Sequence, residues 1–81
     1  MRIKRGEIVK IHSNIEHIRK SKRITQVELA KRLGIPFQTY NNYEKGKRTP
    51  SPETIFKISK ELKVPIEKFF EEKIYDSKNI S

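Results

Sequence analysis

Apolar residues recur at helical spacing along most of the chain, and glycine or proline residues separate several of the runs. Intervals of three and four residues place such side chains on one face of an amphipathic helix. The first run consists of Ile8, Ile11, Ile15 and Ile18. It predicts a helix that ends near Lys22. The start is open between about residue 8 and about residue 14, since Ser13 and Glu16 also have the spacing of a capping box.

A second helix is predicted after Thr25. Thr25 and Glu28 form a capping box, in which the Thr hydroxyl accepts the N–H of Glu28 and the carboxylate reaches back to the N–H of Thr25. The apolar face of this helix consists of Leu29, Ala30 and Leu33. Gly34 follows, and because it lacks a Cβ it can adopt the left-handed backbone conformation that ends a helix.

A third helix is predicted to begin near Pro36, whose fixed φ suits a first helical turn, and to run to about Glu44. Tyr40 and Tyr43 are three residues apart and share one face of it, which should anchor the helix to the core. The opposite face presents Phe37, Gln38, Asn41 and Asn42. An amide side chain can form two hydrogen bonds with an adenine edge in the DNA major groove, so this face has the chemistry to read bases.

The remaining pattern predicts a fourth helix and a short fifth one. The segment 51–53 supplies a serine N-cap, a first-turn proline and an acid that suits the helix dipole, and this helix should run to about Leu62. Pro65 then begins the fifth helix, which contains Phe69 and Phe70 and should close the core. The pattern therefore predicts a compact, all-α, five-helix domain.

The chain divides into three parts on this pattern. Residues 1–10 are a basic arm or a short strand, residues 11–71 form the helical domain, and residues 72–81 are a C-terminal extension. The arm has two interpretations, a contact with DNA phosphates or the minor groove and a disordered leader. The extension is either a frayed tail or part of a dimer contact. The apolar residues of that contact would be Phe69, Phe70, Ile74 and Tyr75.

The segment from Thr25 to Arg48 resembles the helix-turn-helix of phage repressors and Cro proteins, also called the xenobiotic-response-element type. The features that carry the resemblance are Thr-Gln before Glu-Leu-Ala, Leu-Gly at the turn and Glu-x-Gly after the third helix. The resemblance extends from about Ile11 to Phe70 and implies a repressor-like fold around a DNA-reading third helix. Arg23 departs from it, because many relatives have Gly where the first helix ends.

The resemblance also implies roles for particular residues. In that family the positions of Phe37, Gln38 and Asn42 are common base contacts, and Asn41 lies beside them. Asn41 or Asn42 has an alternative role, which is to cap the helix or to contact a phosphate. The implied phosphate contacts are Gln26, Lys45, Lys47 and Arg48. Arg19 and Glu44 are expected to form a partly buried ion pair between the first and third helices, since each also lies next to an apolar residue in the sequence.

Positive charge is concentrated in the first part of the chain. The 81 residues carry a net charge of +9, with +6 in residues 1–24, +3 in residues 25–50 and zero in residues 51–81. A basic surplus beside a base-reading helix is expected of a protein that binds a polyanion. A solvated basic face that only aids solubility would carry the same charge. The charge alone does not separate these interpretations, and the helix-turn-helix motif favours DNA.

The residues that other functions require are scarce or badly spaced. The chain has no cysteine, and its two histidines, His12 and His17, would lie roughly 140° apart on a helix. Asp76 is the only aspartate, and the three glycines do not form a phosphate-cradling run. We therefore expect no metal, no cofactor and no enzyme activity. The longest apolar runs are two residues long, so no membrane span is expected and the protein should be cytoplasmic.

These observations predict a repressor-like regulator of transcription that binds specific double-stranded DNA, as a dimer on a two-fold operator. The alternative is an antitoxin-like or co-regulator module whose main partner is another protein. The basic first fifty residues favour the DNA-binding function. The apolar C-terminal stretch is the feature that keeps the protein-binding alternative open.

Overall fold

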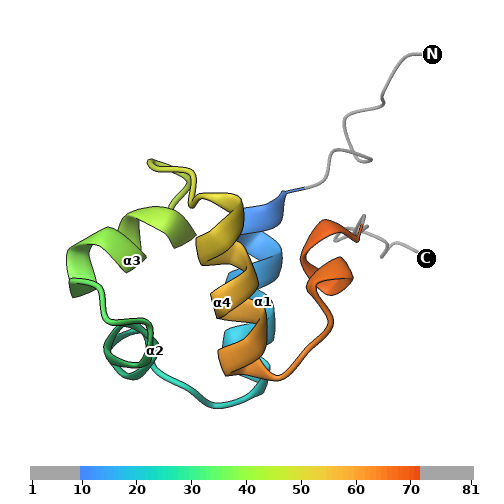
Figure 1. Cartoon of the computed structure of the whole chain (residues 1–81), viewed down its shortest axis with the longest axis horizontal. Coiled ribbons are helices and arrows are strands. Elements are labelled where there is room, and N and C mark those ends of the chain that lie inside the picture. Colours follow the sequence, from blue (N-terminus) through green and yellow to red (C-terminus); the bar gives the residue numbers. More distant parts are fainter. Residues whose placement is uncertain (1–9, 72–81) are drawn as a thin grey trace, which may run out of the picture.

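The computed structural model describes residues 10–71, which form four α-helices followed by one 3-10 helix (Figure 1). The elements are α1 (Ile11–Ser21), α2 (Gln26–Leu33), α3 (Phe37–Glu44), α4 (Pro52–Leu62) and the 3-10 helix η2 (Ile66–Phe70). The predicted all-α class is confirmed. The predicted count of five is one too high for α-helices, because the short segment after Pro65 winds more tightly. The N–H of Lys68 donates to the carbonyl of Pro65 at 3.0 Å, which is the i→i+3 bond of a 3-10 turn.

α1 begins at the middle of the range that the sequence left open. Lys10 has an extended backbone ahead of the helix, and its carbonyl accepts the N–H of Asn14 at 3.0 Å. Ser13 and Glu16 both lie inside the helix, so their capping-box spacing is not used at its start. Glu16 pairs instead with Lys20 one turn later, with 3.0 Å between Oε2 and Nζ.

The boundaries around the central turn follow the local signals of the sequence. Thr25 Oγ1 accepts the N–H of Glu28 at 3.0 Å and caps α2. The Glu28 carboxylate accepts a hydrogen bond from Arg32 Nε, also at 3.0 Å, along the exposed side of the same helix. Gly34 ends α2 with a left-handed backbone at φ +72°, and Pro36 is the extended residue from which α3 starts.

α4 also begins as predicted, with Ser51 Oγ accepting the N–H of Thr54 at 3.1 Å and Pro52 in the first turn. It ends at Lys63, which has a left-handed backbone with φ +59°. Arg23, after α1, has φ +62°. Neither residue is a glycine, so each position stores backbone strain of about 1 kcal/mol.

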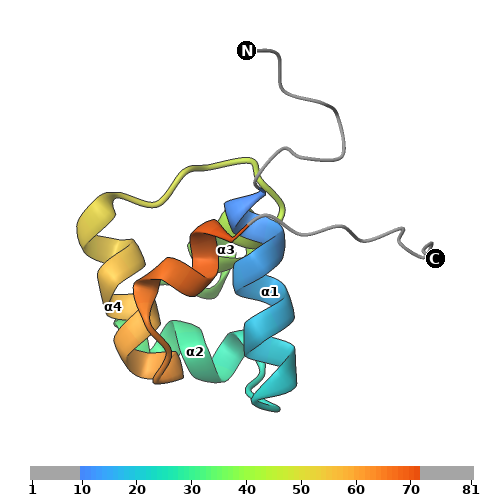
Figure 2. The ribbon, with the colours of Figure 1, turned by 90° about the vertical axis from the view of Figure 1, so that its right-hand side faces the viewer.

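The helices enclose one small core. In Figure 2, η2 crosses between α1 and α4. α1 packs against α3 and η2, while α2 packs against α3 and α4. The buried apolar residues are Ile15, Ile18, Leu29, Ala30, Tyr40, Tyr43, Ile55, Ile58, Leu62 and Phe69. Both tyrosines of α3 belong to this set, so the core determines which face of α3 is directed outward.

Phe69 requires a correction to the expected dimer contact. Its side chain is 0% exposed because η2 inserts it into the core, so it is not available to a partner. Phe70, the next residue, is 46% exposed. Ile74 and Tyr75 lie outside the described residues, as do the extension 72–81 and nearly all of the N-terminal arm. Among the described helices, none is long and apolar enough to cross a membrane.

Candidate nucleic-acid interface

The outward face of α3 presents the residues that the sequence selected as base readers. Phe37 is 43% exposed at the first position of the helix, and Gln38 is exposed beside it. Gln38 Nε2 donates to Asn42 Oδ1 at 3.3 Å, one turn later on the same face. Asn41 and Asn42 are both half-buried. The structure therefore brings an exposed aromatic ring and a string of amides onto one surface.

The orientation of α3 depends on its two buried tyrosines. The rings of Tyr40 and Tyr43 meet edge to face, with 6.4 Å between their centroids and 87° between their planes. Aromatic pairs favour this geometry, because the positive edge of one ring meets the negative face of the other. Since this pair lies in the core, the opposite side of α3 must be directed outward.

A cationic loop follows α3. Lys45, Lys47 and Arg48 are all exposed. The N–H groups of Lys47 and Arg48 donate to the same carbonyl, that of Asn42, at 3.0 and 3.3 Å. Gly46 lies between Lys45 and Lys47, and its backbone, with φ +75°, permits the chain to reverse direction there. The backbone of the loop is thus bonded to the last turn of α3, while its charged side chains remain in solvent.

His12 of α1 lies beneath this loop. A Cβ added to Gly46 would be 3.2 Å from His12 Nε2, which is closer than an ordinary contact. The imidazole borders a hollow of about 170 Å³ whose other lining residues include Tyr43, Arg48 and Ile55. The conformation of the loop therefore depends on packing against α1 as well as on its own sequence.

The start of α2 lies beside the end of α3. Gln26, the first residue of α2, is half-buried, and its Nε2 donates to Glu44 Oε1 at 2.8 Å. The first backbone N–H groups of an α-helix have no partner within the helix, which makes a helix N-terminus suitable for a phosphate. The sequence-predicted phosphate residue thus occupies this terminus, with its side chain bonded to a buried carboxylate.

Glu44 is the centre of a buried hydrogen-bond network. Arg19 Nε donates to Glu44 Oε2 at 2.6 Å and Arg19 Nη2 to Oε1 at 3.2 Å, with the two side chains 8% and 2% exposed. Arg19 Nη1 also donates to the carbonyl of Ile24 at 2.6 Å. The hydroxyl of Tyr40 donates to Glu44 Oε2. The structure therefore brings Arg19 and Glu44 together, and adds two further donors, Tyr40 and Gln26, to the carboxylate.

The network raises the pKa values of two of its members. Burial raises the pKa of the Tyr40 phenol well above its usual range, and the hydrogen bond to the Glu44 carboxylate raises it further. For Arg19, burial acts to lower the pKa, but the hydrogen bond and the negative charge of Glu44 outweigh it and raise the pKa above its usual value. Both groups therefore keep their protons at neutral pH and remain donors to Glu44.

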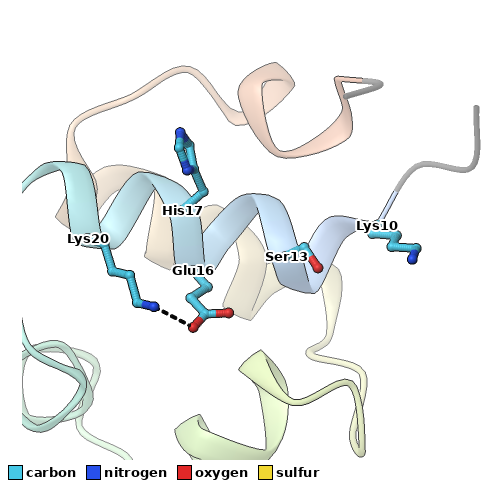
Figure 3. A pocket seen from close by; sticks show the side chains of 5 residues that line it. All are labelled: Lys10, Ser13, Glu16, His17 and Lys20. Carbon is cyan, nitrogen blue, oxygen red and sulfur yellow. Dashed lines mark ion pairs between the residues drawn. The ribbon is translucent and has the colours of Figure 1, made fainter. Parts of the chain in front are cut away.

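A second hollow, of about 340 Å³, runs along α1 and is drawn in Figure 3. Its lining residues are Lys10, Ser13, Glu16, His17 and Lys20. Figure 3 shows the Glu16 carboxylate turned toward Lys20, whereas His17 points to the other side of the helix. These groups do not converge on one point. Within residues 10–71, no group of three His, Cys, Asp or Glu side chains is placed to hold a metal ion.

The sequence pattern did not predict three features of this region. The Tyr40 hydroxyl was assigned only to the core, the contact of His12 with Gly46 joins residues far apart in the chain, and the Gln26 amide was assigned only to DNA. The spacing of Tyr40 and Glu44, four residues apart on one helix, was a signal for the first. The other two depend on how separate helices pack, and no local pattern indicates them.

Comparisons with known proteins agree with this geometry. A family model described as helix-turn-helix matches residues 15–69. A transcriptional regulator of Methanocaldococcus jannaschii is 41% identical over 58 residues, which cover 72% of this chain and 88% of the relative. The cryptic phage CTXphi transcriptional repressor RstR of Vibrio cholerae is 39% identical over 54 residues, which cover 67% of this chain and 49% of that protein.

Two further comparisons bear on fold and length. A transcriptional regulator in the ATPase CF(0) region of Rhodospirillum rubrum is 40% identical over 47 residues, which cover 58% of this chain and 44% of the relative. The chain thus spans about half the length of this relative and of RstR. Among solved structures, the biofilm master regulator SinR in complex with DNA matches with a TM-score of 0.70 and 27% identity, covering 76% of this chain and all of the SinR chain.

Proposed function

The chain belongs to the helix-turn-helix family, and from this premise we propose that it binds specific sequences of double-stranded DNA and regulates transcription as a repressor-like protein. Two relatives support the regulatory part, since RstR is a transcriptional repressor and SinR is a regulator that was solved in complex with DNA. Because DNA is the partner, the expected place of action is the cytoplasm. The proposal is one of binding, with no chemical step.

The observation that carries the proposal is that α3 joins two surfaces, a reading face that begins at its first residue and a cationic loop that follows its last. Its outward face holds exposed Phe37 and Gln38, and the loop bonded to its last turn exposes three cations. Amides in the major groove can read base edges, while cations beside them neutralise phosphates. A surface that served only solubility would not require the loop backbone to be bonded to the reading helix.

The roles of individual residues follow from their positions. Gln38 is the principal base reader, with Phe37 packing on a thymine methyl group and the two asparagines beside them. The phosphate contacts are Gln26, Lys45, Lys47 and Arg48. Gln38 is the residue most free to change its hydrogen bonding, because its 3.3 Å bond to Asn42 is exposed to solvent and can be exchanged for a base edge.

We further propose that the DNA-bound form is a two-fold dimer. One reading helix contacts only a few base pairs, so recognition of a single site in a genome requires two half-sites about 34 Å apart. Exposed Phe70 is the described residue that remains available for the seam, since Phe69 is in the core. Sedimentation of the protein with a palindromic site should give two chains per duplex. One chain per duplex, on a site without internal symmetry, would rule out the dimer.

Selection of bound sequences from a random DNA pool, followed by salt titration, tests the function. We expect enrichment of one motif and an affinity that falls steeply with salt, with a slope of about −0.9 in log K against log salt for each neutralised phosphate. Lys47→Ala or Arg48→Ala should weaken binding to all sequences alike and reduce the slope by about 0.9.

Lys57→Ala is the matched control, because this exposed cation lies on α4 and borders a hollow lined by α2 and α4 residues, with no residue of the cationic loop. Its removal should leave the number of contacted phosphates unchanged. A pool that yields no enriched motif, or an affinity that does not respond to salt, would contradict the proposal. It would favour the alternative module whose main partner is another protein.

A further inference from the structure

The side chain of Gln26 is oriented by a residue of another helix. Its Nε2 donates to Glu44 Oε1 at 2.8 Å, and this contact joins the first residue of α2 to the last residue of α3. Gln26 is half-buried, whereas the Glu44 side chain is 2% exposed. One end of the amide therefore faces the interior of the protein and the rest of it faces solvent.

The chemistry of Glu44 determines which way this amide points. An ionised carboxylate only accepts hydrogen bonds, so the NH₂ end of Gln26 must face it and the carbonyl oxygen must face away. Arg19 donates to both carboxylate oxygens in the geometry of a guanidinium–carboxylate ion pair. One N–H of the NH₂ group is used by Glu44, and the other N–H diverges from it and is left to bond a group outside.

We propose that Glu44 is a positioning residue for DNA binding, which holds the amide of Gln26 so that its second N–H is presented to a phosphate at the N-terminus of α2. This inference rests on the proposed DNA-binding function. An amide that rotated freely would present its carbonyl oxygen to the phosphate in part of the population, and two acceptors repel each other. The carboxylate prevents that orientation.

The same carboxylate also fixes the phosphate contact relative to the reading helix. Glu44 belongs to α3, accepts the hydroxyl of Tyr40 from within α3, and is bound to α1 through Arg19. Gln26 therefore takes its position from the helix that reads the bases. The phosphate contact of Gln26 and the position of α3 on the duplex are therefore coupled, because Gln26 and α3 cannot move independently.

A double-mutant cycle on DNA affinity tests the inference. Gln26→Met keeps the length of the side chain and removes its hydrogen bonds, and it should weaken DNA binding about tenfold in the wild-type background, as expected for a bond to a charged group. In a Glu44→Gln background the same change should weaken binding by about twofold or less, since the amide is no longer oriented. Affinities are compared at a temperature where circular dichroism shows each variant to be folded.

Lys47→Ala provides the matched control, because Lys47 lies on the cationic loop and its effect should be the same in both backgrounds. A tenfold loss for Gln26→Met in both backgrounds would overturn the inference, as would a loss of the Lys47 effect in Glu44→Gln, which would indicate a general structural role. If Gln26→Met has no effect on a wild-type protein that does bind DNA, this inference is wrong and the proposed function stands. A wild type that binds no DNA would contradict both.

If Glu44→Gln does not fold, the hydrogen bond from Gln26 to Glu44 is tested by NMR on the wild-type protein. The side-chain amide protons of Gln26 should show widely separated NMR shifts and slowed exchange with water, because one of them is bonded to a buried carboxylate. Gln38 is the internal reference, since its 3.3 Å bond to Asn42 is exposed. Amide signals of Gln26 that match those of Gln38 would overturn the inference.

Discussion

Asn14 in α1 donates its side-chain amide to the carbonyl oxygen of Phe69 at 2.8 Å, across 55 positions of the sequence. The same nitrogen donates to the carbonyl of Glu71, also at 2.8 Å. Asn14 is 0% exposed, so these bonds lie within or at the edge of the core. They join the end of η2 to the first helix, and in that position η2 buries Phe69.

Asn14→Leu should therefore destabilise the fold without touching the proposed DNA surface. The substitution leaves two backbone carbonyls without this donor, and a buried unsatisfied group costs about 1–3 kcal/mol. We expect a loss of about 3 kcal/mol in the free energy of unfolding, measured by urea denaturation. Ser13→Ala, at the half-buried neighbouring position, should change it by less than about 1 kcal/mol. Equal effects of the two variants would mean that the Asn14 bonds contribute little.

The Arg19–Glu44 pair should behave as a buried ion pair. Removing one partner leaves a buried charge and should cost about 3–5 kcal/mol, whereas an exposed pair would cost at most about 1 kcal/mol. Arg19→Met, Glu44→Gln and the double variant form the cycle, read from urea denaturation. We expect the double variant to be more stable than the sum of the two single changes predicts. Strict additivity would argue that the residues act independently.

Gly34 and Gly46 should respond differently to alanine. Both have positive φ, but nothing lies within 4 Å of a Cβ on Gly34, while His12 Nε2 would be 3.2 Å from a Cβ on Gly46. Gly34→Ala should cost about 1 kcal/mol for backbone strain alone. Gly46→Ala should cost about 1 kcal/mol more, because the imidazole must move.

His12→Ala isolates that steric contribution. In this background Gly46→Ala should cost no more than Gly34→Ala, as measured by thermal or urea unfolding. An excess that persists after removal of the imidazole would mean that the loop, and not its contact with α1, resists the substitution.

Tyr40 makes the protein less stable as the pH becomes alkaline. Because its pKa is raised in the folded state, the native protein holds the phenol proton more tightly than the unfolded chain does. Its contribution is therefore complete below the unfolded value of about 10 and is lost as the pH rises above it. At pH 7, Tyr40→Phe should be less stable by about 1.5 kcal/mol, for the lost bond to a carboxylate.

The free energies of unfolding of wild type and Tyr40→Phe, measured across pH, show whether the contribution of Tyr40 falls as the pH rises. Between about pH 9 and 11 the wild type should lose up to about 1.4 kcal/mol more than the variant. The other titrating groups are common to both proteins, so they cancel in the difference. A difference that stays constant over this range would show that Tyr40 titrates alike in the folded and unfolded chains.

Gln38→Ala should relax base preference at one position of each half-site. A bidentate contact between an amide and adenine contributes about 1–3 kcal/mol of discrimination, and the neighbouring readers are left in place. Selection from a random DNA pool should then yield the wild-type motif with one degenerate base pair per half-site. A variant that loses affinity equally for all sequences and keeps every base preference would identify Gln38 as a phosphate contact.

The sequence by itself determined where α2 and α4 begin and where α2 ends. Thr25 and Ser51 cap α2 and α4, and Gly34 ends α2, because each signal acts between residues at most four positions apart. The outward face of α3 could also be predicted, since the apolar pattern assigns Tyr40 and Tyr43 to the core. These features need no knowledge of what the helices pack against.

Tertiary structure alone decided how distant side chains are used. Phe69 and Phe70 are neighbouring residues of the same type, so a local pattern treats them alike. The packing of η2 against α1 buries the side chain of Phe69 and leaves that of Phe70 exposed. Gln26 and Glu44 are 18 positions apart, and their bond exists because α2 and α3 meet at those ends. A local pattern describes one helix at a time, whereas burial and hydrogen-bond partners depend on several helices packed together, and so they follow only from the folded chain.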